Sequence, residues 1–503
     1  MLECRTGTSR CQLKSMSSRE LLRSLPSIER LLARPAAARL SEYLSRDRVR
    51  DLLREILEEM REELLEGGNS PGDAASDSAR GLSPSDFLTE EVERRLEARA
   101  TASIRPSLRR VINATGVIVH TNLGRAPLAR QAIKALSEVA EHYSNLEYDL
   151  TEGRRGAREK HCSQLLARLA GSEDAIVANN NAAAVMLVLN TLAEGGEVIV
   201  SRGELIEIGG SFRLPDVMAK SGARLREVGT TNRTRISDYE RAINENTRLI
   251  FRVHPSNYRI IGFAERPEVR EIADLASRAG IPSFEDLGSG CLIDIAPYGV
   301  KDEPVVAQSL GAGISVVSFS GDKMLGGPQA GIIAGSRAIV ARVRANPLMR
   351  ALRVDKMTYA ALEATLRLYE RGAAESEVPV IRAMARTRDE IGERARSFSQ
   401  SVERATGGRI RAALEEGESV IGGGSAPEVK LPTVLVAIED SESSASSIED
   451  RLRGYRVPII ARTERDRVMI DLRTVEPDEE AILLDALAAL AQPAPESAAS
   501  VKV

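Results

Sequence analysis

Residues 315–331 read SVVSFSGDKMLGGPQAG, an apolar run that ends at Phe319 and a polar turn that follows it. The run is typical of a buried strand, and the turn holds Lys323 shortly before two glycines. A lysine just beyond a strand end is placed to enter a cleft, where loss of hydration lowers its pKa and allows a Schiff base. Ser320 is placed to hold a cofactor phosphate. An isolated GDK is usually a solvent-facing turn, so the interpretation depends on the surrounding motifs.

Short apolar segments alternate with helical ones from Arg110 to about Gly335. The expected strands are Ala175–Ala178, Glu197–Ser201, Arg248–Val253, Pro282–Asp286, Ser315–Phe319 and Gly331–Ala334. Helical patterns such as Ala182–Leu192 and Glu268–Ala279 lie between them. This alternation predicts an α/β domain with a parallel or mixed sheet wrapped by helices, whose ligands bind at the carboxyl ends of the strands.

An aspartate ends one of these strands, because PSFEDLGSG at residues 282–290 places Asp286 before two glycines. Pyridoxal phosphate (PLP) chemistry needs a carboxylate beside the pyridine nitrogen, since a protonated ring makes the cofactor an electron sink. Asp286, upstream of Lys323, fits that role. Considered alone, an aspartate in this place is about as often a helix cap or a turn residue.

A third element, AIVANNNAAAVMLVL at residues 175–189, runs from a strand through three asparagines into a helix. Free backbone N–H groups at a helix N-terminus form an anion site. We therefore predict that Asn180, Asn181 and Ala182 hold the cofactor phosphate, with simple asparagine capping as the alternative. The three motifs, in this order on one alternating domain, indicate a PLP enzyme.

The composition is that of a globular chain with several domains. With 503 residues, 43% of them hydrophobic, we expect two or three domains. The net charge of −4 argues against wholesale coating of nucleic acid, although a local basic patch remains compatible with it. Four widely spaced cysteines without a C-x-x-C pair indicate free thiols in a reducing cytosol and no metal site. No apolar stretch is long enough to span a bilayer, so a cytoplasmic location is expected.

The N-terminal part is expected to be a small helical domain on a hinge. Helical patterns follow Met16 and continue from Leu40 to Leu65, whereas residues 67–83 have the composition of a linker. Up to Arg50 there are 11 basic and 5 acidic residues, an excess that fits contact with RNA phosphates. A solvated helix face is the alternative interpretation of this charge.

Long stretches beyond these motifs are shared with one family. They are VINATGVIVHTNLGRAPL from Val111, YSNLEYDLTEGRRGAR from Tyr143, SRGELIEIGGSFRLPDVM from Ser201, EVGTTNRT from Glu227, VHPSNYRIIGF from Val253, PLMRALRVDK from Pro347, GGGSAPE from Gly422 and DLRTV from Asp471. With them, the chain resembles the bacterial selenocysteine synthases, the L-seryl-tRNA(Sec) selenium transferases, over roughly residues 20–480. The leader before Met16 and the apparent insertion at 67–83 depart from the family pattern.

The resemblance implies a fold-type I PLP enzyme of the aspartate-aminotransferase class, with Lys323 as the Schiff-base lysine. The expected parts are a helical tRNA-binding head with its linker (1–85), a PLP-binding large domain (86–350), a C-terminal α+β small domain (351–490) and a disordered tail (491–503). A ring-shaped homo-oligomer is also implied, which is a decamer in characterised bacterial members.

The implied reaction converts seryl-tRNA(Sec) to selenocysteyl-tRNA(Sec), with selenophosphate as the selenium donor. We expect Lys323 to act as the base at Cα and to help expel the β-hydroxyl. Selenophosphate is a small, highly charged anion that calls for arginines. Arg350 and Arg353 of MRALRVDK would share one face if this segment is helical, and the resemblance points to them and to Arg125.

Two threonines of GTTNRT, Thr230 and Thr231, are expected to line the site without an assigned role.

Two other functions compete with the predicted selenium transferase activity. One is a PLP lyase or ammonia-lyase that acts on a small amino acid or amino sugar, which would lack the N-terminal head. The other is a catalytically dead RNA-binding scaffold, against which the intact Lys323 and Asp286 motifs argue.

Overall fold

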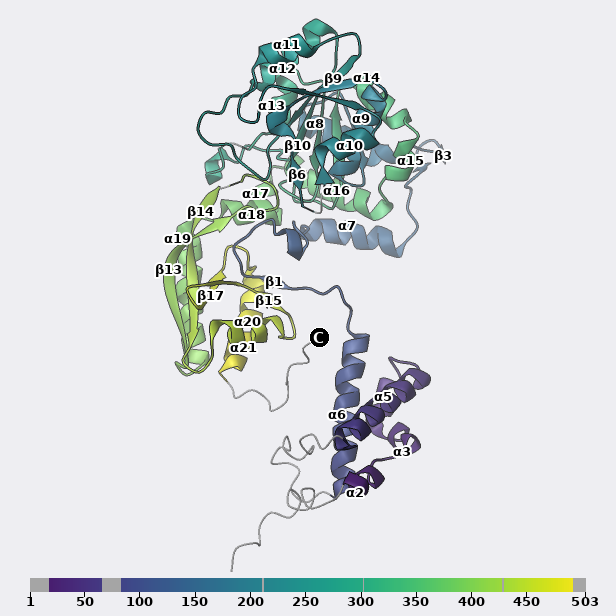
Figure 1. Ribbon diagram of the computed structural model, residues 1–503, viewed down its shortest axis with the longest axis vertical. Coiled ribbons are helices and arrows are strands. Elements are labelled where there is room, and N and C mark those ends of the chain that lie inside the picture. Colours follow the sequence, from purple (N-terminus) through teal and green to yellow (C-terminus); the bar gives the residue numbers. More distant parts are fainter. Residues whose placement is uncertain (1–17, 66–82, 210–211, 302, 428, 492–503) are drawn as a thin grey trace, which may run out of the picture. The chain divides into compact units, whose positions relative to one another are not determined.

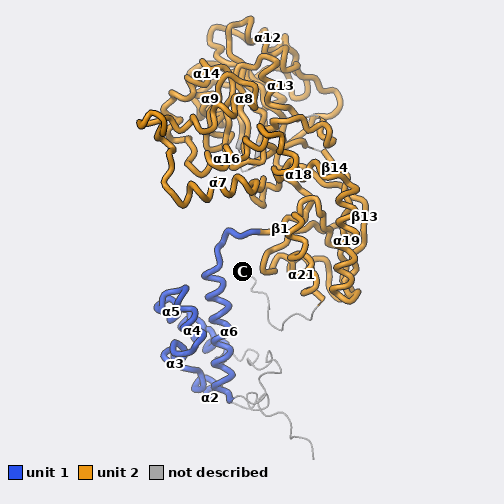
Figure 2. Tube along the Cα trace, turned by 180° about the vertical axis from the view of Figure 1, so that it is seen from behind, with its two compact units in different colours: residues 1–110, 492–503 blue, residues 111–491 orange. Residues whose placement is uncertain are grey.

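The computed structural model describes residues 18–65, 83–209, 212–301, 303–427 and 429–491. These residues form two compact units, one that ends at Arg110 and one that runs from Val111 to Ala491 (Figure 2). The expectations for the leader, for the linker up to residue 82 and for the tail from residue 492 lie outside the described residues.

The smaller unit is a group of helices around an aliphatic core. Its helices are α2 (Ser18–Arg23), α3 (Ile28–Leu32), α4 (Pro35–Leu40), α5 (Arg46–Leu65) and α6 (Pro84–Ile104). The buried side chains of α5 are aliphatic and spaced three or four residues apart, which is the period of one helix face. The continuous helix expected from Leu40 is interrupted by a turn, because the Ser45 hydroxyl accepts the Arg48 backbone N–H and starts α5 anew.

Helix α6 belongs to the core of this unit. Its buried Leu88, Val92 and Leu96 pack in the same apolar cluster as the α5 side chains, and Arg95 pairs with Glu63 of α5 at 2.9 Å. The sequence placed the end of the head at residue 85. The compact unit instead extends to Arg110, because α6 supplies part of its core.

A seven-stranded mixed sheet forms the centre of the larger unit (Figure 1). Its strands, in spatial order, are β4 (Asp174–Ala178), β12 (Gly331–Gly335), β11 (Val316–Ser320), β10 (Ser283–Gly288), β9 (Thr247–Val253), β5 (Glu197–Ser201) and β8 (Arg224–Val228). Only β12 runs antiparallel to its neighbours in this sheet. The six strands expected from the sequence are all present, within one or two residues at each end. The edge strand β8 escaped prediction because its RLREV sequence is mostly polar and exposed.

Helices cover both faces of this sheet. They are α7 (Arg130–Glu141), α8 (Ser163–Ala170), α9 (Asn181–Ala193), α10 (Leu214–Lys220), α11 (Ile236–Ala242), α12 (Val269–Ala279), α13 (Val306–Gly311), α14 (Arg337–Ala345), α15 (Leu348–Leu352), α16 (Lys356–Glu370), α17 (Ala374–Glu377) and α18 (Pro379–Ala385). One core contains side chains of α7, α8, α12, α13 and α16, and the other contains those of α9, α10 and α14. The two cores are the two layers expected of an α/β domain.

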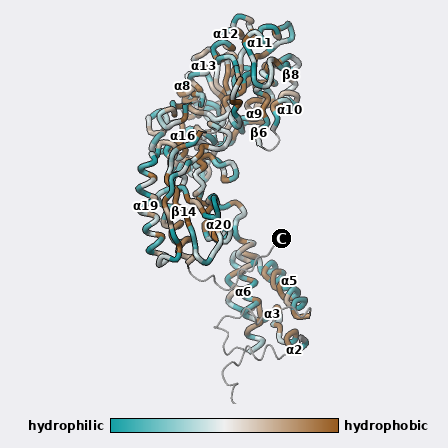
Figure 3. The backbone as a smooth tube through the Cα atoms, turned by 60° about the vertical axis from the view of Figure 1, so that its left-hand side comes forward, coloured by the Kyte–Doolittle hydropathy of each residue, from teal (hydrophilic) through white to brown (hydrophobic). Residues whose placement is uncertain are grey.

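The remaining elements build a smaller α+β domain within the same unit. Its antiparallel sheet has the order β13 (Ile410–Val420), β14 (Lys430–Asp440), β17 (Arg467–Asp471) and β16 (Arg462–Glu464), and its helices are α19 (Arg388–Ala405), α20 (Ala445–Arg453) and α21 (Glu480–Leu490). The largely hydrophilic α19 lies along the hydrophobic β14 (Figure 3). Strand β1 (Ile112–Asn113) pairs with β15 (Ile459–Ile460) and so joins this domain.

The boundary between the two domains of this unit differs from the expected residue 351. Helix α16 and the short helices after it pack in the core of the large domain, whereas the core of the small domain begins with Ile391 of α19 and also takes in Ile112 and Ala114.

In the described parts of the chain, no helix is long and apolar enough to cross a membrane. Within those same parts, no cluster of His, Cys, Asp and Glu side chains is arranged to hold a metal ion.

Candidate active site

Lys323 lies in a closed turn immediately after β11. The Gly321 backbone N–H donates to the Ala330 carbonyl at 2.8 Å, and the Gly327 N–H donates to the Gly321 carbonyl at 2.8 Å. A Cβ at Gly321 would meet the Pro328 carbonyl oxygen at 2.6 Å, so this tight turn requires glycine there. Only 7% of Lys323 is exposed, and this burial lowers the pKa of its amine.

Asp286 lies on the neighbouring strand β10, where it is in register with Ser318 of β11. Its Oδ1 accepts hydrogen bonds from Asn181 Nδ2 at 2.8 Å, from the Gly288 backbone N–H at 3.1 Å and from Ser318 Oγ at 3.4 Å. None of these donors contacts Oδ2, which leaves that oxygen for a further donor. Burial raises the pKa of Asp286, while these hydrogen bonds and the positive charge of Lys323 oppose the rise.

The expected anion site lies at the N-terminus of α9. Asn180 caps this helix, because its Oδ1 accepts the Ala183 backbone N–H at 2.9 Å. Because its side-chain oxygen is used for this cap, Asn180 can bind an anion only through its backbone. The backbone N–H groups of Asn181 and Ala182 belong to the first turn, whose donors have no partner within a helix. Ser320 is buried and pairs with Gly331 of β12, which in turn packs tightly against Asn180.

Two buried polar atoms around this lysine have no hydrogen-bond partner among the described residues. They are Asn181 Oδ1 and Ser425 Oγ. A buried polar atom without a partner costs free energy, so a group of them indicates a missing polar ligand. PLP has a ring nitrogen, a phenolic oxygen and a phosphate. Asp286 Oδ2, the buried polar atoms named above and the N-terminus of α9 together fit a ligand with these groups.

Arg125 reaches the lysine turn from a distant part of the chain. Its Nη1 lies 2.7 Å from Asp322 Oδ2, next to Lys323, and the Ala126 backbone N–H donates to the Asp322 carbonyl at 3.3 Å. The Arg125 backbone has a φ of 65°, in the left-handed region that few residues other than glycine adopt. The sequence singled out Arg125 but not its partner Asp322, since only the tertiary fold brings them together.

Arg350 and Arg353 do not share a helix. Helix α15 ends at Leu352, and Arg353 follows it in an extended conformation, so the two arginines do not share the expected helix face. Arg353 forms a β-bridge with Ala178 at the end of β4, directly before the asparagine loop. Its Nη1 lies 3.7 Å from Glu147 Oε1. Arg350 is exposed on α15.

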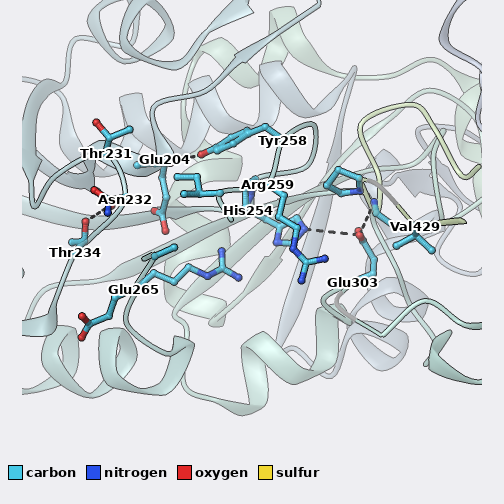
Figure 4. Close-up of a pocket in the computed structure, with 18 residues that line it drawn as sticks. Glu204, Thr231, Asn232, Thr234, His254, Tyr258, Arg259, Glu265, Glu303 and Val429 are labelled. Carbon is cyan, nitrogen blue, oxygen red and sulfur yellow. Dashed lines mark hydrogen bonds and ion pairs between the residues drawn. The ribbon is translucent and has the colours of Figure 1, made fainter. Parts of the chain in front are cut away.

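Of the two threonines, Thr231 lines a pocket whose lining includes His254 and Glu303 (Figure 4). The Thr230 hydroxyl donates to the Arg233 carbonyl at 3.0 Å within its own loop. His254 and Glu303 received no role from the sequence. His254 follows β9, and Glu303 lies in the loop before α13, so nothing in their local sequences indicated that they would meet.

The sheet order, the lysine–aspartate pair at the carboxyl ends of β10 and β11, and the added α+β domain together define a fold-type I enzyme of the aspartate-aminotransferase class. Among solved structures, the fold is similar to that of D-glucosaminate-6-phosphate ammonia-lyase, with a TM-score of 0.53 over 76% of this chain and 96% of that chain, at 21% identity.

Sequence comparison places the chain within that class. Residues 111–476 match the L-seryl-tRNA selenium transferase family, and residues 22–61 match the N-terminal domain of selenocysteine synthase. The chain belongs to the L-seryl-tRNA(Sec) selenium transferase family.

Relatives with that name are similar over most of their length. The protein of Geobacter metallireducens is 48% identical over 421 residues, which cover 82% of this chain and 91% of the relative. That of Nitratidesulfovibrio vulgaris is 50% identical, with 82% and 86% covered. That of Moorella thermoacetica is 45% identical, with 94% and 97% covered.

Proposed function

We propose that this chain uses PLP to convert seryl-tRNA(Sec) to selenocysteyl-tRNA(Sec), by elimination of the serine hydroxyl and addition of selenium from selenophosphate. The observation that carries the proposal is the buried Lys323 amine near Asp286, whose three protein donors all bind Oδ1. Membership of the selenium transferase family supports the choice of substrate.

Each residue of the site has a part in this reaction. PLP, when bound, supplies an electron sink for the negative charge that develops at Cα. Asp286 would hold the proton of the ring nitrogen through Oδ2. Lys323 would hold the cofactor and then carry the Cα proton, because burial lowers the pKa of its amine toward the range where a base works at neutral pH. Asn181, Ala182 and Ser320 would hold the phosphate.

The selenium donor is assigned to the arginines. Arg353 and Arg125 each lie next to a part of the proposed cofactor site, Arg353 beside the end of β4 and Arg125 beside the Lys323 turn. Both side chains are more than a third exposed, so a small anion from solution can reach them. Arg350 is the third candidate. Thr230 and Thr231 stay candidates for substrate contact in the loop that borders the neighbouring pocket.

We further propose a cytoplasmic homo-oligomer, with the decamer of bacterial members as the expected size. The family resemblance supports this assembly, and light scattering of the purified protein measures it.

An absorbance band at about 420 nm, typical of PLP joined to a lysine, tests cofactor loading. Absence of that band after incubation with PLP would contradict the proposed function.

Replacing Arg353 with alanine is expected to weaken use of selenophosphate by roughly ten- to a hundredfold, because charge-assisted hydrogen bonds to a phosphate are among the stronger polar contacts. Loss of the serine hydroxyl from seryl-tRNA(Sec) should stay normal, since that step requires Lys323 and not the donor. The measurement follows loss of hydroxyl first and selenium incorporation after selenophosphate is added. Failed elimination, or normal incorporation at limiting selenophosphate, would refute the assignment.

Removing the head is expected to abolish binding of tRNA while the remaining unit keeps its fold and its PLP. The sequence suggested a cut at residue 85, but the core contacts of α6 call for deletion of residues 1–110. A gel shift with tRNA(Sec) measures binding, and circular dichroism and the band near about 420 nm report the fold and the cofactor. Full-affinity binding of tRNA by the shortened protein would contradict the role of the head.

A further inference from the structure

Glu303 is a buried carboxylate that connects the two domains of the larger unit. Its side chain is 1% exposed, and its Oε2 accepts a hydrogen bond from the Ala426 backbone N–H at 2.9 Å. The same oxygen lies 3.9 Å from His254 Nε2 (Figure 4). Burial lowers the pKa of His254 to about 3, so this imidazole is neutral and does not pair with the carboxylate as a cation. The Ala426 backbone N–H and the Ser289 side chain are the hydrogen-bond partners of the Glu303 carboxylate.

The segment that Glu303 contacts has an unusual backbone. Gly422, Gly423 and Gly424 have φ values of 75°, 67° and 72°, which glycine adopts without steric cost. Ala426 follows with a φ of 44°, in a region that is unfavourable for a residue with a Cβ. Such a conformation persists only where surrounding contacts hold it, and the hydrogen bond to Glu303 is such a contact.

This glycine-rich segment also lies against the lysine. A Cβ added at Gly424 would be 3.6 Å from Lys323 Nζ and 3.8 Å from Ser256 Oγ. Gly422 and Gly423 pack so closely on Val117 and Val119 that a Cβ at either would come within 2.5 Å of those side chains. The small domain therefore supplies one wall of the site, and the position of that wall determines the space around the amine.

We propose that Glu303 is a positioning residue, whose carboxylate holds Ala426 and thereby keeps the turn Gly422–Ala426 of the small domain against Lys323. The negative charge of Glu303 also favours the protonated form of that lysine. The expected effect on turnover rests on the proposed function, whereas the effect on the turn does not. The two can therefore be tested separately.

Amide hydrogen exchange of the full-length protein, measured on the peptide that contains Ala426, tests this proposal without any substrate. Glu303→Ala should exchange on the order of tenfold faster there, because loss of the acceptor increases local opening. Glu303→Gln keeps an acceptor oxygen and should exchange at nearly the wild-type rate. Glu245→Ala, at an exposed glutamate of the large domain, is the matched control and should change nothing.

Two further variants keep the test decisive. If Glu303→Ala does not fold, Glu303→Asp can replace it. Its side chain is one methylene shorter, so the acceptor oxygen lies farther from Ala426, and the peptide that contains Ala426 should also exchange faster. Adding Ala426→Gly to Glu303→Ala should restore part of the protection, because glycine tolerates the positive φ.

With seryl-tRNA(Sec), Glu303→Ala should lower kcat by roughly tenfold with little change in KM, and Glu303→Gln should keep most of the wild-type kcat.

Unchanged exchange in Glu303→Ala, or exchange in Glu303→Gln as fast as in Glu303→Ala, overturns the proposal. Faster exchange in the alanine variant, together with rescue by glutamine, supports it even if the wild-type protein does not act on seryl-tRNA(Sec). In that case the proposed function fails, and the positioning role of Glu303 stands.

Discussion

Lys323→Ala is expected to abolish turnover, to at least roughly 10⁴-fold below the wild-type rate, and to leave no covalently held PLP. The reason is that one amine has two parts in the proposed reaction, as the attachment point of the cofactor and as the carrier of the Cα proton. Among the described residues Lys323 is the only buried lysine, so no other lysine is placed inside the site to take over. Borohydride reduction followed by peptide mapping measures the attachment, and an assay with seryl-tRNA(Sec) measures turnover.

The matched control is Lys220→Ala, which removes an exposed lysine from the end of α10. This variant should keep both the trapped PLP and the wild-type rate. If Lys323→Ala still traps PLP at another lysine and retains turnover, the assignment of the attachment site is wrong.

Asp286→Asn is expected to keep PLP bound but to lower turnover by on the order of 10²–10³-fold, the range seen when a group that stabilises developing charge is removed. The amide can still accept hydrogen bonds from Asn181 and Gly288, so the local structure should survive. What is lost is the negative charge that would keep the ring nitrogen of bound PLP protonated. Rates with seryl-tRNA(Sec), together with cofactor content from absorbance, separate the two effects.

Asp274→Asn, at an exposed position of α12, is the control for this substitution and should behave as the wild type. A near-normal rate in Asp286→Asn would remove Asp286 from its role. Loss of PLP along with the rate would instead make Asp286 a residue that is needed for cofactor binding.

The sequence predicted the central sheet well because its strands are short, apolar and separated by helical patterns. It also predicted that Lys323, Asp286 and the asparagine loop would meet, since the ends of neighbouring strands share one edge of a sheet. In the structure Asn181 and Ser318 both contact Asp286, which brings the three motifs together. The strand β8 was missed because an exposed edge strand carries little apolar signal.

Features that depend on tertiary contacts were not predictable in this way. The head extends to Arg110 because α6 packs on α5, and a helical pattern alone does not say which core it joins. The pairing of Arg125 with Asp322 and the contact of Glu303 with Ala426 each join residues more than a hundred positions apart. Arg353 lies outside its expected helix because α15 ends at Leu352, so its place beside β4 comes from the bridge to Ala178.

The most direct measurement of the proposed function is a turnover assay of the full-length protein with PLP, seryl-tRNA(Sec) and selenophosphate, in which the amino acid released from the tRNA is identified by mass spectrometry. We expect that serine is replaced by selenocysteine, that the replacement requires selenophosphate, and that Lys323→Ala protein gives none. Serine that stays unchanged on the tRNA, while the same preparation releases ammonia from a free amino acid or amino sugar, would contradict this expectation and would indicate a small-molecule lyase.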